Sequence, residues 1–369
     1  MKNENPCLAA AVAAFPYEGE IVRLEPFGSG HINDTYAVWV QGEAQPRLAY
    51  ILQRLNTNVF KKPREVMGNI VGVTEFLHGK IEADGRCARR HVLHFIKTTQ
   101  GETAFYDTEG MPWRSYHFIE NSFCYEKSPT VDALYHSARA FGDFLCSLRE
   151  YPAHTLHETI PGFHDTRRRV QALREAVAED TAGRAAACRA DIDFALAREK
   201  DAALLMDMLD RGELPLRVTH NDTKLNNVLF DSDTGEAVCI IDLDTIMPGL
   251  SLNDYGDSIR FGATTAAEDE PDLAKVNFSL ELFEAYTRGY LETAGPALTA
   301  AEKQLLPQGA RLLTLECGIR FLADYLSGDT YFKTEHPRHN LERCRTQFKL
   351  VADMEREMQA MAAVVEKYS

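Results

Sequence analysis

Apolar residues follow two different spacings, and the change from one to the other divides the chain near residue 120. The N-terminal part contains short apolar runs bounded by glycine, proline and asparagine, which are typical of strands. We predict strands at 21–26, 35–40, 47–52, 92–98, 103–106 and 113–119. A short alanine-rich helix is expected at 5–16. A longer one is expected at 63–78, where apolar residues recur at helical spacing after a proline.

The C-terminal part is largely helical in its spacing from Thr130 onward. Helices are predicted at 131–149, 167–177, 185–199, 202–210, 278–292, 300–325 and 341–368. The pattern therefore predicts an α+β chain with a small N-terminal domain built on a sheet, residues 1–120. A large, mainly helical C-terminal domain follows, residues 121–369.

One stretch of the helical part returns to strand spacing, and it carries a dense set of polar residues. Apolar runs at 228–231 and 237–242 are separated by turn residues at 232–235, which predicts a hairpin. Such a hairpin folds its second strand back toward the loop that precedes the first. The polar side chains at its ends are Asp222, Lys224, Asn227, Asp242 and Asp244.

This inventory suits phosphoryl transfer, in which one carboxylate accepts a hydroxyl proton and oxygen ligands hold magnesium on the nucleotide. The spacing of His220, Asp222 and Asn227, followed by an Asp that closes a strand, resembles the catalytic loop and metal-binding aspartate of the protein-kinase-like fold. The resemblance implies that Asp222 is the base and that Asn227 and Asp242 are metal ligands, with Asp244 as a further candidate. Lys224 matches the lysine that protein kinases direct at the transferred phosphate. The alternative is an acidic hairpin with a hydrogen-bonded asparagine, which explains neither the order nor the spacing of these residues.

A nucleotide site requires further groups, and the N-terminal part offers several. Gly28, Gly30 and Asn33 lie between the first two strands, as in a loop that covers phosphates, although two glycines there alone indicate only a hairpin turn. The third strand ends at Gln53 and Arg54, where kinases carry a phosphate-binding lysine. Strand alternation lets only one of the two face the nucleotide, and the sequence does not decide which.

The partner of that missing lysine is equally open, because either Glu65 or Glu75 of the predicted helix can take the role. The segment after the last strand, which includes Phe118 and Glu120, is the expected hinge whose backbone binds adenine. We interpret Asp254 as a carboxylate that braces the catalytic loop through backbone N–H groups. The segment Phe163-His164-Asp165, which precedes the arginines at 167–169, is either a substrate loop or, as we favour, a helix cap with solvated arginines.

Composition and charge limit the classes of molecule that this chain is expected to bind. The formal net charge of −15 makes nucleic acid and anionic membranes poor partners. Glu4 precedes an apolar run at 8–15, which argues against a signal peptide, and no run is long enough to span a membrane. Eight scattered cysteines without a C-x-x-C pair indicate reduced thiols. A cytoplasmic protein is expected.

Five segments together resemble a known family: GSGHIN, RVTHNDTKLNN, IIDLDTIMPG, GDSIRFGA and ECGIRFLADYL. They are similar to the aminoglycoside phosphotransferase/choline kinase superfamily and, more narrowly, to N-acetylhexosamine 1-kinases. The resemblance implies a bilobal protein-kinase-like fold. It also implies an enzyme that uses ATP and Mg²⁺ to phosphorylate the anomeric hydroxyl of N-acetylglucosamine or N-acetylgalactosamine. The sugar pocket that it implies contains His31, Arg320, Asp324 and Tyr331.

Two alternatives stay open. Glu316, Arg320 and Asp324 are spaced to share one helical face, which also fits a simple row of ion pairs. The acceptor is open as well, because a kinase of choline, homoserine or an aminoglycoside carries the same catalytic loop. A nucleotide-binding protein without catalysis is the alternative from another class.

Overall fold

The computed structural model describes residues 6–28, 32–125 and 130–369, which belong to two compact units. The first unit comprises Met1–Phe123, Glu150–Ile160 and Leu229–Met247. The second comprises Cys124–Arg149, Pro161–Val228 and Pro248–Ser369. The chain first passes from one unit to the other after Phe123, close to the predicted boundary at residue 120.

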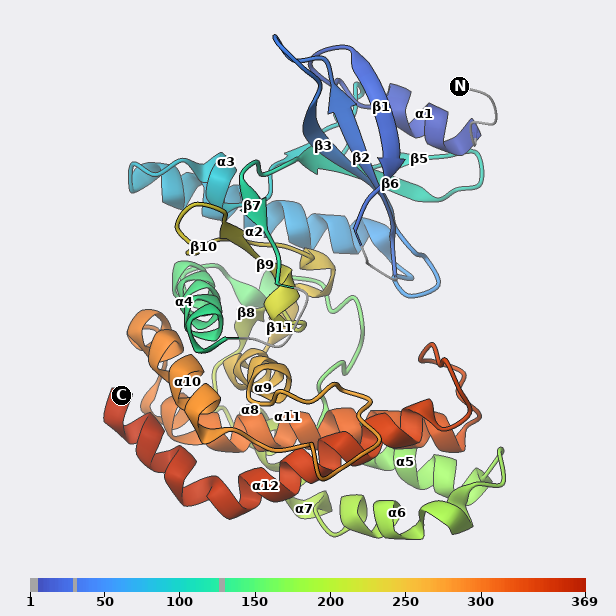
Figure 1. Cartoon of the computed structure of the whole chain (residues 1–369), viewed down its shortest axis with the longest axis vertical. Helices are drawn as coiled ribbons and strands as arrows, with labels where there is room; N and C mark the ends of the chain where they lie inside the picture. Colours follow the sequence, from blue (N-terminus) through green and yellow to red (C-terminus); the bar gives the residue numbers. More distant parts are fainter. Residues whose placement is uncertain (1–5, 29–31, 126–129) are drawn as a thin grey trace. The chain divides into compact units, whose positions relative to one another are not determined.

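An antiparallel sheet organises the first unit (Figure 1), with strands in the order β1–β2–β3–β6–β4 and β5 paired with β6. The strands are β1 Ile21–Pro26, β2 Asp34–Val40, β3 Arg47–Arg54, β4 Phe95–Ile96, β5 Phe105–Tyr106 and β6 Pro112–His117. Helix α1 (Pro6–Ala14) packs on one face against Tyr50, Leu52 and Trp113. Helix α2 (Pro63–Ala83) places Met67 beside Arg114 of β6.

The predicted strands and helices of this unit are confirmed with one substantial correction. The expected strand at 92–98 reduces to the two residues of β4, and a short helix, α3 (Ala88–His91), precedes it. Val92 and Leu93 are buried although they pair with no strand. Their apolar character therefore reflects core packing, which a run of buried residues cannot distinguish from a strand.

Two small sheets accompany the central hairpin. In one, β10 (Ala237–Ile240), β9 (Val228–Asp231) and β7 (Ser122–Phe123) lie side by side in that order. In the other, β8 (Arg217–Thr219) pairs with β11 (Met247–Gly249). The predicted hairpin is confirmed, but its second strand ends at Ile240, before the carboxylate of Asp242.

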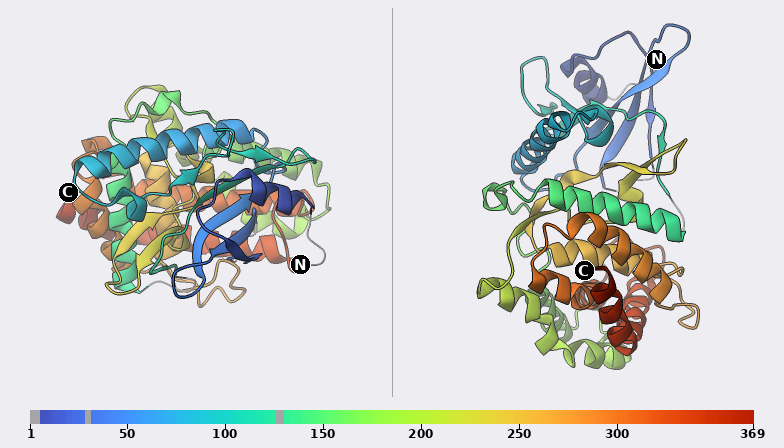
Figure 2. Two further views of the ribbon diagram at one scale, coloured as in Figure 1. Left: turned by 90° about the horizontal axis from the view of Figure 1, so that it is seen from above. Right: turned by 90° about the vertical axis from the view of Figure 1, so that its left-hand side faces the viewer.

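Helices dominate the second unit, as predicted. The longer ones are α4 Val131–Ser147, α5 Thr166–Glu179, α9 Ser251–Gly262, α10 Leu280–Ala294, α11 Ala300–Leu326 and α12 His339–Tyr368. The shorter α6 (Arg189–Leu196), α7 (Glu199–Ala202) and α8 (Leu204–Asp210) divide a region expected to hold two helices. Figures 1 and 2 show α4 beside α10 and α11 beside α12, and these pairs make the most contacts.

Helix ends are fixed by side chains that also connect elements. Asp165 caps α5 by accepting the Arg167 N–H at 3.1 Å, which confirms the predicted cap. Thr299 and Glu302 form a capping box at the start of α11. The Glu302 carboxylate also binds Arg217 of β8 at 2.8 Å. One capping residue thus ties α11 to the strand that leads into the catalytic loop.

Helix α9 was not predicted, because its segment contains several glycines and follows a proline. The structure shows what one of these glycines does. A methyl group on Gly256 would lie 2.6 Å from the carbonyl oxygen of Gly309, so α9 and α11 approach each other backbone to backbone. Gly256 therefore permits close helix packing here, at the helix that carries Asp254.

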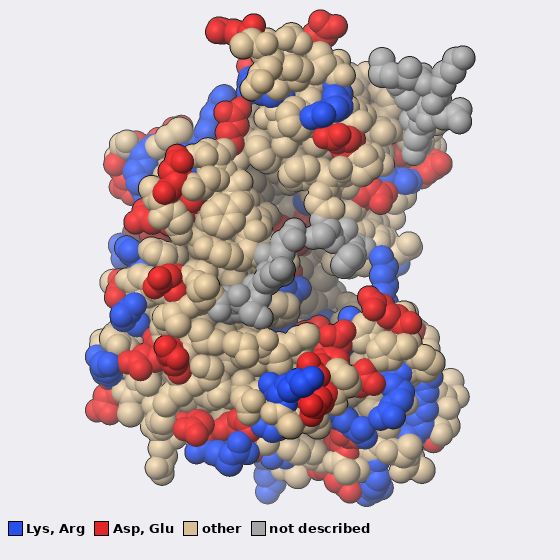
Figure 3. Space-filling model, in the orientation of Figure 1, with Lys and Arg blue, Asp and Glu red and all other residues tan. Residues whose placement is uncertain are grey.

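Charged side chains of both signs are interspersed over the face drawn in Figure 3. Many form ion pairs, such as Arg174 with Glu199 and Arg345 with Asp191. Among the described residues, no helix combines the length and the apolar character needed to cross a membrane. None of the eight cysteines, which all lie within the described residues, forms a disulfide.

We predict that Gly256→Ala destabilises the protein by about 1–3 kcal/mol, because the added methyl group must displace the backbone of α11. Gly79→Ala is the matched control, since that helical glycine has open space around it. It should be neutral or stabilising by up to about 1 kcal/mol through helix propensity. Thermal unfolding of both variants tests this, and equal melting temperatures would contradict the packing argument.

Candidate active site

The loop between β8 and β9 gathers the three residues predicted for the catalytic loop. The Asp222 carboxylate accepts hydrogen bonds from both neighbours, one oxygen from the Lys224 ammonium at 2.7 Å and the other from the Asn227 amide nitrogen at 3.0 Å. The same amide nitrogen donates to the Asp222 carbonyl at 2.8 Å. Because the Asn227 nitrogen is the donor, its carbonyl oxygen is the atom left to bind a cation.

A buried carboxylate from α9 sets the shape of this loop. Asp254 accepts the backbone N–H groups of His220 at 2.8 Å and Asn221 at 2.7 Å. Asn221 has a φ of 64°, which an L-residue adopts only when its surroundings hold it. The ring of His220 packs edge-on against Phe141 of α4. These contacts confirm the predicted role of Asp254 as the brace of the loop.

Electrostatics distinguish the two aspartates. Burial disfavours the charge on Asp222, but the Lys224 ammonium outweighs burial and lowers the pKa of Asp222 below its ordinary value. Burial likewise works against the ammonium, yet Asp222 and Asp257 raise the pKa of Lys224. For Asp254, burial dominates and raises its pKa to about 6. The loop therefore presents an ionised Asp222.

The sheet unit contains a second polar group, built around a residue that the sequence analysis did not identify. Arg114 of β6 lies opposite Gln53 of β3 in the strand register, and its Nε and Nη2 donate to Gln53 Oε1 at 3.0 and 2.8 Å. Its Nη1 forms an ion pair with Asp244. The second Asp244 oxygen accepts the amide of Asn33 at 2.6 Å. The sequence offered one sign of this role, because Arg114 is a charged residue within the predicted strand 113–119.

The register also decides between Gln53 and Arg54. Gln53 lies on the sheet face that carries Arg114, whereas Arg54 points to the opposite face, toward Trp113, and binds Glu109 at 2.7 Å. Neither expected glutamate takes part, because Glu65 pairs with Lys62 and Glu75 with Lys97. The cation of this face therefore comes from β6, and its partner is Asp244.

The two candidate metal ligands after β10 differ in conformation and in their partners. Asp242 has a φ of 59°, in the left-handed region that is uncommon for a non-glycine residue. Both carboxylate oxygens of Asp244 already accept hydrogen bonds, from Arg114 and Asn33. The two residues therefore differ in backbone conformation, and Asp244 is the one held by an ion pair with Arg114.

The remaining nucleotide candidates are only partly described. Gly28 has a φ of 78°, which suits glycine, whereas Gly30 and His31 lie outside the described residues. The ring of Phe118 meets that of Phe27 edge to face. The backbone N–H of Phe118 donates a hydrogen bond to the carbonyl oxygen of Ala49. The Glu120 carbonyl accepts a hydrogen bond from Arg90 at 2.7 Å.

The predicted sugar residues have unlike surroundings. Arg320 forms no ion pair or hydrogen bond among the described residues, and its guanidinium lies over the rings of Phe163 and Phe332. Tyr331 is 65% exposed. Asp324 is committed elsewhere, because its oxygens accept the backbone N–H groups of three consecutive residues and the side-chain amide of Asn340. Asp324 therefore shapes the loop after α11.

A row of ion pairs along Glu316, Arg320 and Asp324 does not form. Glu316 instead accepts hydrogen bonds from His164 at 2.8 Å and Thr166 at 2.7 Å, and the other nitrogen of His164 lies 3.4 Å from the carbonyl oxygen of Asn221. His164 thus connects the catalytic loop to α11. The position of His164 in the sequence, beside a helix cap, did not indicate that its side chain makes this connection.

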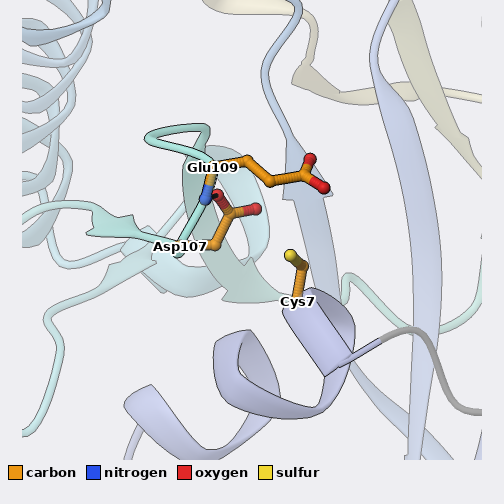
Figure 4. A group of neighbouring side chains, drawn as sticks. All are labelled: Cys7, Asp107 and Glu109. Atoms are coloured by element: carbon orange, nitrogen blue, oxygen red, sulfur yellow. Dashed lines mark hydrogen bonds between the residues drawn. The ribbon is translucent and has the colours of Figure 1, made fainter.

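Figure 4 shows a further group with metal-ligand chemistry, Cys7 at the start of α1 with Asp107 and Glu109 after β5. Its carboxylates have other partners. Asp107 accepts two backbone N–H groups and the indole N–H of Trp113 at 2.8 Å. Arg54 balances Glu109. We therefore interpret the group as a brace for the turn between β5 and β6.

Several solved structures share this fold at low sequence identity. A microcompartment-associated aminopropanol kinase shares 16% identity and a TM-score of 0.57, covering 97% of this chain and 99% of its own. An aminoglycoside phosphotransferase from Alicyclobacillus acidocaldarius shares 12% identity and a TM-score of 0.61, covering 97% and 95%. A spectinomycin phosphotransferase in complex with ADP and spectinomycin shares 15% identity and a TM-score of 0.52, and the match covers 100% of each chain.

These similarities confirm the predicted fold class, an N-terminal antiparallel sheet followed by a mainly helical region. The family itself is shown by sequence. The model described as the phosphotransferase enzyme family matches residues 23–295, which is well over half of the chain, and it includes the catalytic loop. The chain therefore belongs to the phosphotransferase enzyme family.

Proposed function

We propose that this phosphotransferase moves the terminal phosphoryl group of ATP onto the anomeric hydroxyl of an N-acetylhexosamine, forming the sugar 1-phosphate. The observation that carries the proposal is the braced loop in which Asp222 is ionised and held from both sides by Lys224 and Asn227. Solved relatives bind AMP-PNP with Ca²⁺ in one case and ADP in another, which supports a nucleotide as donor here.

Asp222 is the group that takes the proton of the acceptor hydroxyl. A carboxylate with a lowered pKa is a weak base, but a loose phosphoryl-transfer transition state needs little proton transfer before the acceptor attacks. A hemiacetal hydroxyl is also more acidic than an ordinary alcohol. The main contribution of the loop is therefore positioning. Lys224, bound to Asp222, places positive charge where negative charge develops on the transferred group.

Asn227 and Asp242 are the proposed ligands of Mg²⁺. Carboxylate and amide oxygens are the ligands that this ion prefers, and Asn227 uses its nitrogen as a hydrogen-bond donor, which leaves the oxygen available. The bound ion would neutralise charge on the nucleotide phosphates. The backbone of Asp242 is held in a sparsely populated conformation, as is common at functional sites.

The acceptor assignment has its own support in the second unit. Arg169 and Arg320 lie close enough that burial and the like charge of Arg320 lower the pKa of Arg169. The nearby carboxylates of Glu316 and Asp324 are already hydrogen-bonded. Two cations without a spare carboxylate disfavour a cationic acceptor such as choline or an aminoglycoside. A guanidinium flanked by aromatic rings favours a neutral polar acceptor such as a sugar.

A panel of acceptors tests the assignment. N-acetylglucosamine, N-acetylgalactosamine, choline, homoserine and an aminoglycoside are incubated with ATP and Mg²⁺, and the products are followed by phosphorus NMR. We expect a sugar 1-phosphate signal from one or both hexosamines. Phosphorylation of choline, homoserine or the aminoglycoside alone would replace the acceptor and leave the phosphotransferase assignment intact.

Asp222→Asn should lower kcat by about 10²–10⁴-fold, because the amide cannot accept the proton that the acceptor hydroxyl loses when its oxygen takes the phosphoryl group. Its affinity for ADP, measured by calorimetry, should change little. Asp143→Asn is the matched control on the exposed side of α4 and should retain full activity. A variant at Asp222 with half the original rate would contradict the assignment.

Lys224→Met should shift the pH dependence of kcat/KM. With Lys224 present, the pKa of Asp222 lies below its ordinary value, so activity should persist well into the acidic range. Without the ammonium, burial is no longer offset, and the pKa of Asp222 rises. The acid limb of the profile should therefore move to higher pH. An acid limb that stays in place while kcat falls would show that Lys224 does not act through Asp222.

A methyl glycoside of the preferred hexosamine should not turn over, because it lacks the anomeric hydroxyl that Asp222 is proposed to deprotonate. The 6-deoxy sugar keeps that hydroxyl and should still react if the pocket tolerates the change. Both are measured in a coupled ADP assay under the same ATP and Mg²⁺ concentrations. Turnover of the methyl glycoside would exclude 1-kinase chemistry without affecting the family assignment.

A further inference from the structure

The face of the sheet that carries Gln53 obtains its positive charge from a neighbouring strand. Gln53, at the end of β3, is uncharged, and Arg114 lies directly across from it on β6. Residues paired across an antiparallel sheet share one face, so the guanidinium extends over the same surface as the amide. Two hydrogen bonds to Gln53 Oε1 fix the plane of the guanidinium. Gln53 is thus the side chain that orients this cation.

The ion pair between Arg114 and Asp244 is almost fully withdrawn from solvent. Each side chain is only 3% exposed. Burying two charges is costly unless they are paired and their remaining polar atoms are hydrogen-bonded. Both conditions are met, because Gln53 accepts from Arg114 and Asn33 donates to Asp244. A buried pair satisfied on all sides has little freedom to move.

The pair is also connected to the loop that carries the proposed metal ligand. Asp244 belongs to the short 3₁₀ turn Leu243–Thr245, which follows Asp242 directly, and Asp242 is the residue with left-handed backbone angles. On its other side, Asp244 accepts a hydrogen bond from the side-chain amide of Asn33, which immediately precedes β2. Asn33 in turn accepts the backbone N–H of Asn56 at 3.0 Å. One carboxylate therefore ties together three separate segments.

We propose that Arg114 is a positioning residue for the metal–nucleotide complex. By holding Asp244, Arg114 fixes the backbone at Asp242 in the conformation that directs its carboxylate to the cation, and it anchors the turn that bears Asn33. The inference rests on the proposed function in one respect, namely that a nucleotide and a divalent cation bind this unit. The ligand class is a nucleoside di- or triphosphate with a divalent metal.

Arg114→Met is the decisive variant, with Mn²⁺ and ADP as the probes. Electron paramagnetic resonance of Mn²⁺ measures its binding in the presence of ADP, and calorimetry measures binding of ADP without metal. We expect the affinity for Mn²⁺·ADP to fall by about 10–100-fold, as for residues that orient metal ligands. The affinity for metal-free ADP should change less than about two-fold, since Arg114 acts through the metal ligand. Equal losses in both measurements would overturn the positioning role in favour of direct phosphate contact.

Arg54→Met is the matched control, because it removes the same charge from the neighbouring position on the opposite sheet face. Its affinity for Mn²⁺·ADP should equal that of the unaltered protein. A loss as large as that of Arg114→Met would show that any charge removed from this sheet weakens binding, and would overturn the inference.

A double variant addresses the case in which Arg114→Met folds poorly. Arg114→Met leaves Asp244 buried without its partner, whereas Arg114→Met/Asp244→Asn removes both charges and should regain thermal stability. If the pair only stabilises the fold, the double variant regains Mn²⁺·ADP affinity as well, which would overturn the proposal. If the pair positions Asp242, stability returns and the affinity does not.

No acceptor is present in these measurements, so an incorrect sugar assignment does not affect them. Absence of Mn²⁺·ADP binding by the unaltered protein would refute the nucleotide part of the proposed function. Normal binding by both the unaltered protein and the folded Arg114→Met variant would refute this inference alone.

Discussion

The catalytic loop depends on one buried carboxylate. Asp254 accepts two consecutive backbone N–H groups, from His220 and Asn221, in a part of the second unit closed to water. Buried N–H groups without partners would each carry a desolvation cost, so the carboxylate and the loop stabilise each other. The left-handed backbone of Asn221 is the strain that this contact sustains. The next residue, Asp222, is thereby directed to its neighbours by backbone geometry.

Acidic groups in the two units differ in the partners that hold them. Asp244, Glu316 and Asp324 accept hydrogen bonds from arginine, histidine or backbone donors, and they hold structure in place. Asp222 is bonded instead to a lysine and an asparagine of its own loop, which the proposed function assigns to the transfer. In a chain with 55 acidic residues, this distinction separates chemistry from scaffold better than charge does.

Distant relatives share this fold while their names describe different acceptors, among them aminopropanol and spectinomycin. A fold therefore constrains the transfer step more than the acceptor. In this chain Arg320 lies over two aromatic rings, with Arg169 nearby, and the proposed function uses these groups to choose among acceptors.

The sequence by itself predicted a sheet followed by helices, the hairpin and the loop that carries Asp222, because periodicity and short motifs are local properties. It also identified Asp254 as a brace. It did not determine that Arg114 supplies the cation beside Gln53, nor that His164 reaches Glu316, since strand register and long-range packing pair residues far apart in the chain. Helix α9 was missed for a related reason: Gly256 resembles a helix breaker until the backbone of α11 is seen against it. The tertiary structure alone decided which partners hold each polar side chain, because folding brings together residues that are far apart in the sequence.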